Sequence, residues 1–451
     1  MLDVFFKHTN LDFDKSSYMR AKDHIFVNAY FISNDEVCSV CNSTKLIKNG
    51  HVNKTVKHCV YNTSLIIVKC NFQSFKCKDC NHIFTEKNLF SPNNISFSYE
   101  SIFAILDALK YPNASFESVA RTFHISRQNV IDLFDKFFTY YPSPTLPTIL
   151  SFDEKHIGKA ISDHKFTFIM LDWKNKKVYD ILKSRDKNTL WKYFGSIPRE
   201  ERDKVQYITM DMWSTYKDVS KHFFRNAKIA VDSFHVMENI NRAMNKVRCI
   251  VMAKYNQKTE DINDNHLYYY LLKKFDYFFT KEFDDITNHP IRIPKLKTKL
   301  HKNAIMKYLL DIDDRINEAY KLTSKYREFN RTAKFDTCEE ELDELIDLFL
   351  KSSLSHFNDI GRTLFNWRDE IINSFITIKD CLTIPKKKDE KPVPRRLSNG
   401  PIEGINSIIE QIKINGKGYT NFDRFKKRII YVINKELVIK GNPNKLLRNS
   451  K

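Results

Sequence analysis

Three kinds of hydrophobic pattern follow one another along the chain. Between residues 99 and 140, apolar side chains recur at helical spacing and are interrupted at Tyr111-Pro112-Asn113, which predicts a group of short helices. From residue 148, short segments rich in β-branched and aromatic residues predict strands alternating with helices. From residue 249 to 397 helical stripes return, as in residues 267–279, 300–316 and 340–350. The sequence therefore predicts several domains.

The middle pattern has a definite order of elements. Three strands, a helix, a strand, a helix, a strand and a helix are predicted over residues 148–158, 165–173, 176–185, 186–194, 205–211, 213–224, 228–232 and 233–247. This is the order of an RNase H-like α/β fold, in which the first and fourth strands are neighbours. Asp153 closes the first strand and Asp211 closes the fourth. We therefore expect these two carboxylates to lie together.

Carboxylates on strand ends suit a magnesium site. Mg²⁺ selects hard oxygen ligands on rigid elements, and two Mg²⁺ ions about 3.5–4 Å apart can assist both the attacking and the leaving oxygen of a phosphodiester. Two metal ions need a third carboxylate. Glu238, in the helix after the fifth strand, and Glu403, behind Gly400-Pro401 where a helix can begin, both qualify. The residues by themselves leave this choice open.

Four of the nine cysteines form two pairs, Cys38-Ser-Val-Cys41 and Cys77-Lys-Asp-Cys80. Two such turns can hold one structural zinc ion, and the β-forming residues between them suit a zinc ribbon. The alternative is disulfides. Residues 1–18 carry acids and no apolar signal core, so we expect a cytoplasmic protein with reduced thiols. Cys59 and Cys70 lie in the predicted strands, either as buried thiols or as alternative ligands.

Residues 116–130 have the spacing of a helix-turn-helix. A small residue, a turn residue, an apolar residue, an N-cap and a buried valine occupy the required positions: Ala120, His124, Ile125, Ser126 and Val130. Arg127, Gln128 and Asn129 would begin the second helix, where side chains reach base edges in the major groove. An ordinary helical hairpin gives the same pattern, but the neighbouring ribbon and the basic chain favour DNA binding.

The charge balance also indicates an acidic partner. The chain carries 74 basic and 55 acidic residues, a net charge of +19, and residues 386–451 alone contain 17 basic and 6 acidic residues. Nucleic acid is the partner that such a surplus favours, because its phosphates attract lysine and arginine. Apolar runs such as residues 64–68 and 166–171 are far shorter than the ~18–20 residues of a membrane span, so we expect no membrane partner.

Together these patterns predict a multidomain α/β protein. A zinc ribbon and a helix-turn-helix precede an RNase H-like catalytic core that an all-α insertion interrupts. The predicted parts are an N-terminal segment, the ribbon, the helix-turn-helix, the first part of the core, the insertion, and the last core helix with a basic tail: residues 1–34, 35–90, 95–141, 148–248, 249–397 and 398–451.

Four stretches resemble the ISL-three family of insertion-sequence transposases over nearly the full length of the chain. They are the cysteine ribbon, the helix-turn-helix, VQYITMDMWSTYKDV with AVDSFHVMENINRAMNKVR, and LSNGPIEGINSIIEQIK with GYTNFDRFKKRI. The family is of the DDE type, and the resemblance implies a triad of Asp153, Asp211 and Glu403, which chooses Glu403 over Glu238. Asp232 and His235 also match family positions. Asn42 stands where the family's ribbon usually has glycine.

The resemblance implies a bacterial DNA transposase. It would bind the terminal inverted repeats of its element, cleave a strand end with two Mg²⁺ ions, and join the freed 3′-hydroxyl to target DNA, as at least a dimer. Basic residues near the end of the chain would hold phosphates: Lys413, Lys417, Arg424, Lys426, Lys427 and Arg428. The alternatives are a transposase-derived regulator that binds DNA without cutting it, and a stand-alone RNase H-like nuclease.

Overall fold

The computed structural model describes residues 11–31, 37–61, 63–256, 263–383 and 391–435. It divides into two compact units. The first contains residues 1–142, 157–163 and 405–451, and the second contains residues 143–156 and 164–404. The end of the predicted basic tail, residues 436–451, lies outside the described residues.

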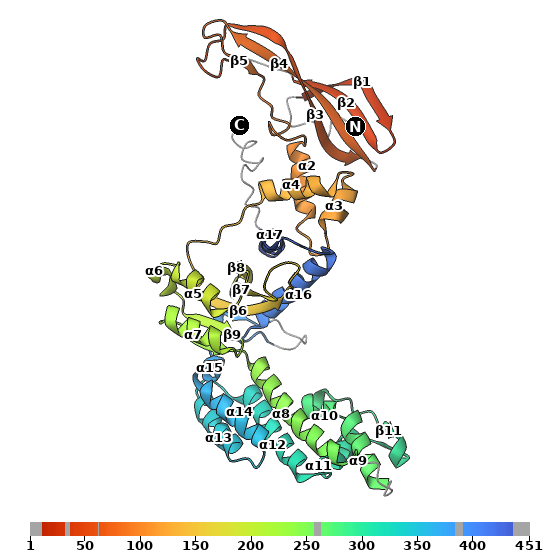
Figure 1. The fold of residues 1–451 in the computed structure, drawn as a ribbon, viewed down its shortest axis with the longest axis vertical. Helices are drawn as coiled ribbons and strands as arrows, with labels where there is room; N and C mark the ends of the chain where they lie inside the picture. The colour runs from red at the N-terminus through yellow and green to blue at the C-terminus, as the bar shows by residue number, and fades with distance from the viewer. Residues whose placement is uncertain (1–10, 32–36, 62, 257–262, 384–390, 436–451) are drawn as a thin grey trace. The chain divides into compact units, whose positions relative to one another are not determined.

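The first unit begins with a five-stranded sheet (Figure 1). Its strands are β1 (Leu11–Ala21), β2 (His24–Phe31), β3 (Leu46–Tyr61), β4 (Ser64–Cys77) and β5 (Ile83–Thr85). The order is β1-β2-β4-β3, with β5 on β4; β2 runs parallel to β4 and the other pairs are antiparallel. Strands β1 and β2 therefore extend the ribbon sheet beyond the boundary predicted at residue 35. In β2, buried and more exposed residues alternate, which packs one face into the core.

Short helices follow the sheet in the first unit. They are α2 (Tyr99–Ala108), α3 (Phe116–Thr122) and α4 (Arg127–Phe137). The turn between α3 and α4 contains His124 with φ of +51°, and Ser126 caps α4 by accepting a hydrogen bond from Asn129 N. The turn and the cap between α3 and α4 are therefore formed by the residues that the spacing predicted.

The last described helix of this unit, α17 (Phe422–Asn434), packs on those short helices. Arg428 is fully buried and donates hydrogen bonds to the carbonyl oxygens of Leu109, Tyr111 and Ala114. Its guanidinium therefore joins α17 to the α2–α3 connection. We withdraw Arg428 from the predicted phosphate contacts, because a buried guanidinium with three backbone acceptors does not face DNA.

Arg428→Ala is expected to lower the free energy of unfolding of the first unit by about 3 kcal/mol or more, because three carbonyl oxygens lose a charged donor. All four tryptophans, Trp173, Trp191, Trp213 and Trp367, belong to the second unit. Far-UV circular dichroism should therefore show an earlier transition while tryptophan fluorescence does not move. Lys427→Ala, one residue away and partly exposed, is the control. Equal shifts in both variants would contradict this role for Arg428.

The second unit is built on a sheet of order β10-β9-β6-β7-β8. The strands are β6 (Ile149–His156), β7 (Phe166–Asp172), β8 (Lys177–Leu182), β9 (Tyr207–Met210) and β10 (Lys228–Val231). β6, β7 and β8 are antiparallel neighbours, whereas β6, β9 and β10 run parallel. Helices α5 (Lys187–Gly195), α6 (Arg199–Arg202) and α7 (Ser214–Phe223) connect the strands. Apart from the additional short helix α6, the order of elements is the one predicted, and the first and fourth predicted strands, β6 and β9, are neighbours.

A largely helical region with its own core follows α8 (Ser233–Lys254), as Figure 1 shows. Its other helices are α9 (Asn263–Lys274), α10 (Tyr277–Thr280), α11 (Lys302–Leu310), α12 (Asp314–Thr332), α13 (Cys338–Leu350), α14 (Ser355–Asn366) and α15 (Arg368–Asn373). Two short strand pairs interrupt the predicted all-helical pattern: β11 (Ile291–Ile293) with β12 (Thr298–Leu300), and β13 (Thr377–Leu382) with β14 (Pro394–Arg396). Helix α16 (Gly400–Asn415) begins in this unit and continues into the first.

Candidate active site and zinc site

Two parallel strands bring the first two predicted acids together. Phe152 on β6 pairs with Met210 on β9, so Asp153 and Asp211 follow paired residues at the same end of the sheet. Among the described residues, ligand atoms of Asp153, Glu154 and Asp211 lie within 4.8 Å of one another. The expectation that Asp153 and Asp211 lie together is therefore met.

Burial makes the negative charge of Asp153 costly. Asp153 is 8% exposed, and its pKa is raised to about 8 by burial and then by the negative charge of Asp211. The backbone N–H of Glu154 donates to Asp153 Oδ1 at 2.7 Å and opposes that shift. Two carboxylates in such a place are stabilised by a shared proton or by a cation. Asp153 lies within β6, which continues to His156, so the prediction that it closes this strand was wrong; Asp211 directly follows β9. Their hard oxygen ligands fit Mg²⁺.

Glu154, the third member of this cluster, already has partners. Its carboxylate pairs with Arg185 and accepts a hydrogen bond from Tyr216 Oη at 3.2 Å. The Arg185 guanidinium lies 4.4 Å from the ring centre of Phe166 and 4.5 Å from that of Trp213. Through these contacts Glu154 holds Arg185 and Tyr216 beside the two aspartates, and Trp213 packs on the same Arg185.

Helix α8 places a histidine on the second acid. His235 Nε2 lies 2.9 Å from Asp211 Oδ1, and the hydrogen bond to Asp211 raises the pKa of His235 to about 9. His235 Nδ1 lies 3.6 Å from Glu238, whose other oxygen pairs with Arg242 at 2.6 Å. Glu238, the competing third acid, is therefore paired on both oxygens with cationic side chains of its own helix.

Asn399 connects the acid-bearing elements and was not recognised from the sequence. Its side-chain Nδ2 donates to Asp211 Oδ1 at 2.9 Å and to the Phe152 carbonyl at 3.1 Å. Its backbone N–H donates to Asp232 Oδ2 at 3.0 Å, while Asp232 caps α8 through Phe234 N. The residue is 1% exposed. An amide next to a glycine before a predicted helix was the available signal.

Glu403 lies in the first turn of α16, one turn after Asn399. Its backbone N–H donates to the Asn399 carbonyl at 3.1 Å. Burial raises the pKa of its carboxyl, and the negative charges of Asp232 and Asp211 add to the shift. Its side chain is exposed and lies outside the 4.8 Å cluster. The structure thus brings Glu403 within electrostatic reach of Asp211.

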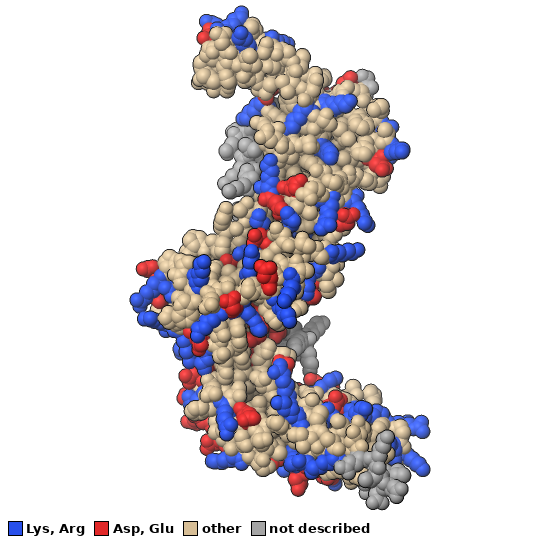
Figure 2. Space-filling model, in the orientation of Figure 1, with Lys and Arg blue, Asp and Glu red and all other residues tan. Residues whose placement is uncertain are grey.

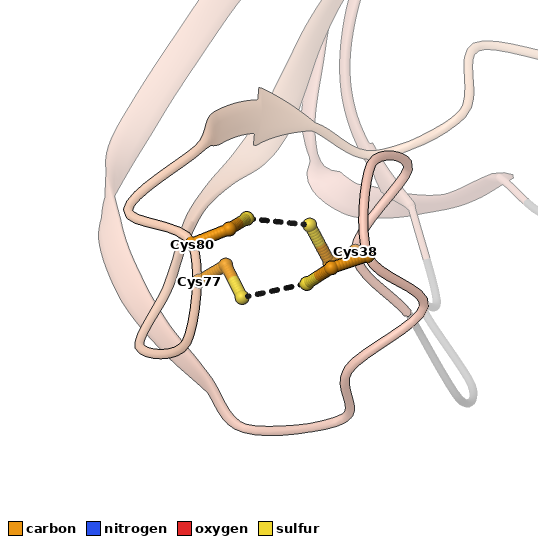
Figure 3. Close-up of side chains that lie close together, drawn as sticks. Cys38, Cys77 and Cys80 are labelled. Carbon is orange, nitrogen blue, oxygen red and sulfur yellow. Dashed lines mark hydrogen bonds between the residues drawn. The ribbon is translucent and has the colours of Figure 1, made fainter.

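The four paired cysteines meet in the first unit, as Figure 3 shows. Sγ of Cys38 lies 3.5 Å from Sγ of Cys80, and Sγ of Cys41 lies 3.5 Å from Sγ of Cys77. Backbone hydrogen bonds lower the pKa of Cys77 to about 6, which favours a thiolate. All nine cysteines are free thiols. Four thiols at these separations fit a tetrahedral zinc ion with bonds of about 2.3 Å.

Each cysteine turn is closed by an asparagine in the left-handed region. Asn42 has φ of +56° and donates its N–H to the Cys38 carbonyl; Asn81 has φ of +60° and donates to the Cys77 carbonyl. Asparagine tolerates this conformation better than most residues with a side chain. Asn42 can therefore adopt the left-handed conformation at the position where the ribbon of the family named above usually has glycine.

Cys59 and Cys70 lie apart from the four-cysteine cluster. A β-bulge in β3 places Cys59 beside His58 and Glu100, with its Sγ 3.4 Å from His58 Nε2. Cys70 is buried in the core of the sheet. Burial raises the pKa of each thiol to about 12. Cys70 is thus a buried thiol. Cys59 is partly exposed, and its ligand atom lies within 4.8 Å of ligand atoms of His58 and Glu100, so its alternative role as a ligand stays open.

The predicted DNA-binding residues fall in the first unit. Arg127 and Gln128 are exposed at the start of α4, and Asn129 is partly exposed. Arg127 also borders a small cavity shared with Gly416, Tyr419 and Arg424. The basic residues that remain at least partly exposed are Lys413, Lys417, Arg424, Lys426 and Lys427; of these, Arg424 pairs with Asp135 at 2.7 Å and Lys413 lies 3.4 Å from Glu410.

A family model described as a transposase, that of the ISL-three DDE transposases, matches residues 150–382 and 392–429. The chain belongs to this transposase family. The match covers Asp153, Asp211 and Glu403 and ends inside α17. No curated protein matches the chain. Among the described residues, no helix combines the length and the apolar character needed to cross a membrane.

The acids of this transposase predict an unusual pH dependence of stability. In the metal-free protein, the pKa of Asp153 is raised from 3.8 to about 8 and that of His235 from 6.5 to about 9. Between its unfolded and folded pKa values, each group binds more protons in the folded state than in the unfolded state. The two ranges overlap from about pH 6.5 to 8, so the free energy of unfolding falls as the pH rises across this range. Mg²⁺ should reverse this trend, because metal binding favours the deprotonated carboxylates.

The measurement is thermal unfolding followed by tryptophan fluorescence in EDTA and in Mg²⁺, at several pH values. We expect the melting temperature in EDTA to fall across this range, and Mg²⁺ to raise it more at the alkaline end. A melting temperature in EDTA that rises with pH would contradict the assignment. Asp153→Asn should remove the part of the fall that belongs to Asp153.

Proposed function

We propose that this chain is a Mg²⁺-dependent DNA transposase with an RNase H-like catalytic core. The observation that carries the proposal is a pair of neighbouring carboxylates on adjacent parallel strands, in the region that matches the transposase family. Asp153 is buried within β6, and Asp211 is partly exposed directly after β9. Its substrates would be the terminal inverted repeats of its element and then target DNA, in the bacterial cytoplasm. Synapsis of two ends would require at least a dimer.

Asp153, Asp211 and Glu403 would hold the two metal ions. When bound, Mg²⁺ would supply Lewis-acid activation of the attacking oxygen and stabilisation of the leaving oxygen. The chain's own residues prepare this place. Asn399 orients Asp211 by donating to its Oδ1, and burial keeps bulk water from the Asp153 carboxyl. Glu403 would complete the site by a rotation of its exposed side chain toward Asp211.

The four-cysteine zinc ribbon and the helix-turn-helix would recognise the repeats. Arg127, Gln128 and Asn129 would read base edges from the start of α4. The exposed lysines near α16 and α17 would bind phosphates and fix the register without reading sequence. Zinc would have a structural role only, because four thiolates leave no open coordination position.

The test is cleavage of a duplex that carries the inverted repeats flanking the coding region. We expect strand cleavage in Mg²⁺ and, with target DNA, strand transfer. Repeat binding without cleavage would favour a DNA-binding regulator, and cleavage indifferent to the repeat sequence and to zinc would favour a stand-alone nuclease. Glu403→Gln with full activity would reject Glu403 as a ligand, and Glu410→Gln, two turns further along α16, is the matched control.

A further inference from the structure

Helix α8 presents basic side chains along its exposed side. Asp232 caps the start of the helix, and His235 in its first turn contacts Asp211. The helix ends at Lys254. Arg242 and Lys246, one turn apart, are exposed, and so is Lys254 in the last turn. Arg242 and Lys254 also face Glu238 and Asp313, yet their side chains remain 62% and 55% exposed. Figure 2 shows basic side chains over this helix and over the far end of the helical region.

A pocket opens where α8 ends. It has a volume of about 660 Å³, within the range of ligand sites. The lining residues include Tyr255, Tyr269, Tyr270, Lys273, Lys274 and Lys295. Lys273 lies 5.6 Å from the ring centre of Tyr269, and Lys274 lies 5.3 Å from that of Tyr270. The described residues that line it include no acid. Such a surface combines ammonium groups for phosphates with flat rings for sugar contacts.

The length of α8 relates this pocket to the catalytic acids. The helix has 22 residues, which corresponds to about 33 Å at 1.5 Å per residue. Ten base pairs of B-DNA span about 34 Å. A duplex that lies along α8 with its scissile phosphate at Asp211 would therefore present its backbone to the pocket about one helical turn away.

We propose that α8 and this tyrosine–lysine pocket form a second contact for double-stranded DNA, about ten base pairs from the scissile phosphate. The proposal rests on the proposed function for the position of the cut, but the contact itself needs no catalysis. Arg242, Lys246 and Lys254 contact phosphates along the way. Lys273, Lys274 and Lys295 hold the backbone at the pocket, where tyrosine rings pack on deoxyribose. The contact depends on how far the duplex extends beyond the cleavage point and not on its base sequence.

The experiment measures the dissociation constant of duplexes that end in a terminal repeat and carry arms of about 4, 8, 12 or 16 base pairs beyond the cleavage point. Arms are extended separately on each side, and Ca²⁺ replaces Mg²⁺ to prevent cleavage. We expect the dissociation constant of the wild type to fall about tenfold when the arm on one side is lengthened beyond about ten base pairs. Lys273→Glu with Lys295→Glu should abolish this gain without changing the affinity for the shortest duplex.

The matched control reverses two exposed lysines outside the pocket in the same helical region, Lys307→Glu with Lys321→Glu, and should keep the gain. Tryptophan fluorescence melting verifies that both double variants fold. A wild type without a length step, or a pocket variant that keeps it, would overturn the proposal. Competition by a free mononucleotide would also overturn it in favour of a small-ligand pocket. A wild type that shows the step but never cleaves in Mg²⁺ would defeat only the proposed function.

Discussion

Replacing Asp153 with asparagine is expected to slow metal-dependent strand cleavage by about 10³-fold or more, because the amide has the same size but is a poor ligand and carries no charge. The substitution should leave the fold intact. The pKa of this carboxyl is raised to about 8, so at neutral pH the metal-free protein already favours a neutral side chain there. Rates are measured on a repeat-containing duplex under single-turnover conditions in Mg²⁺ and in Mn²⁺.

The control for this prediction is Asp218→Asn on α7. Asp218 is exposed and lies 3.2 Å from Lys187, so its loss removes one surface ion pair that is worth little. We expect its cleavage rate to equal that of the wild type. Repeat binding should be unchanged in both variants. Full cleavage by Asp153→Asn, with melting as in the wild type, would remove Asp153 from the active site.

The second large effect is expected at the four-cysteine site. Cys77→Ser should lower the bound zinc from one ion per chain to none and unfold the two cysteine turns. Structural zinc contributes about 10–16 kcal/mol of apparent binding free energy in small zinc domains. Without the turns, the loop before β3 and the end of β4 lose their connection. We expect repeat binding to weaken by about tenfold or more, as measured by fluorescence anisotropy.

Cys381→Ser is the matched control, because Cys381 is a free thiol in β13 of the second unit. Zinc is quantified by release to a chromogenic chelator after thiol oxidation. The second unit should melt as in the wild type in both variants when tryptophan fluorescence is followed. One zinc ion per chain retained by Cys77→Ser would show that the metal lies elsewhere, with Cys59 and His58 as the next donors to replace.

The parts of this protein that were predictable share a local origin. Asp153 and Asp211 could be placed close together because short hydrophobic segments predict the strands and their order. The cysteine turns could also be placed from short segments. The predicted end of the first strand at Asp153 was wrong, because β6 continues to His156.

Arg428 was assigned wrongly because a charged residue is normally expected on the surface. It is buried here because it donates to three carbonyl oxygens of residues more than 300 positions away in the sequence. Asn399 was missed because its hydrogen-bond partners, Phe152 and Asp211, are also far away in the sequence.

The two strands β1 and β2 show a different limit. β2 alternates clearly, but β1 contains charged and hydroxyl residues throughout most of its length and resembles a polar leader. Its pairing with β2 depends on a partner strand, which a single segment does not reveal. Likewise, the pairing of Glu154 with Arg185 joins residues from different elements and follows only from the three-dimensional structure. The pairing of Glu238 with Arg242, four residues apart on one helix, could have been predicted from the sequence.

The position of Asn399 has a consequence for how the protein is made. The amide that orients Asp211 is synthesised 188 residues after it, and Glu403 follows only then. A chain that is still growing at this point already contains α2–α4 but lacks Asn399, Glu403 and the helix α17 that packs on α2–α4. Premature termination before this point would therefore remove the amide that orients Asp211 and, at the same time, the helix that supports α2–α4. Incomplete translation would yield a product impaired in both units rather than a stray nuclease.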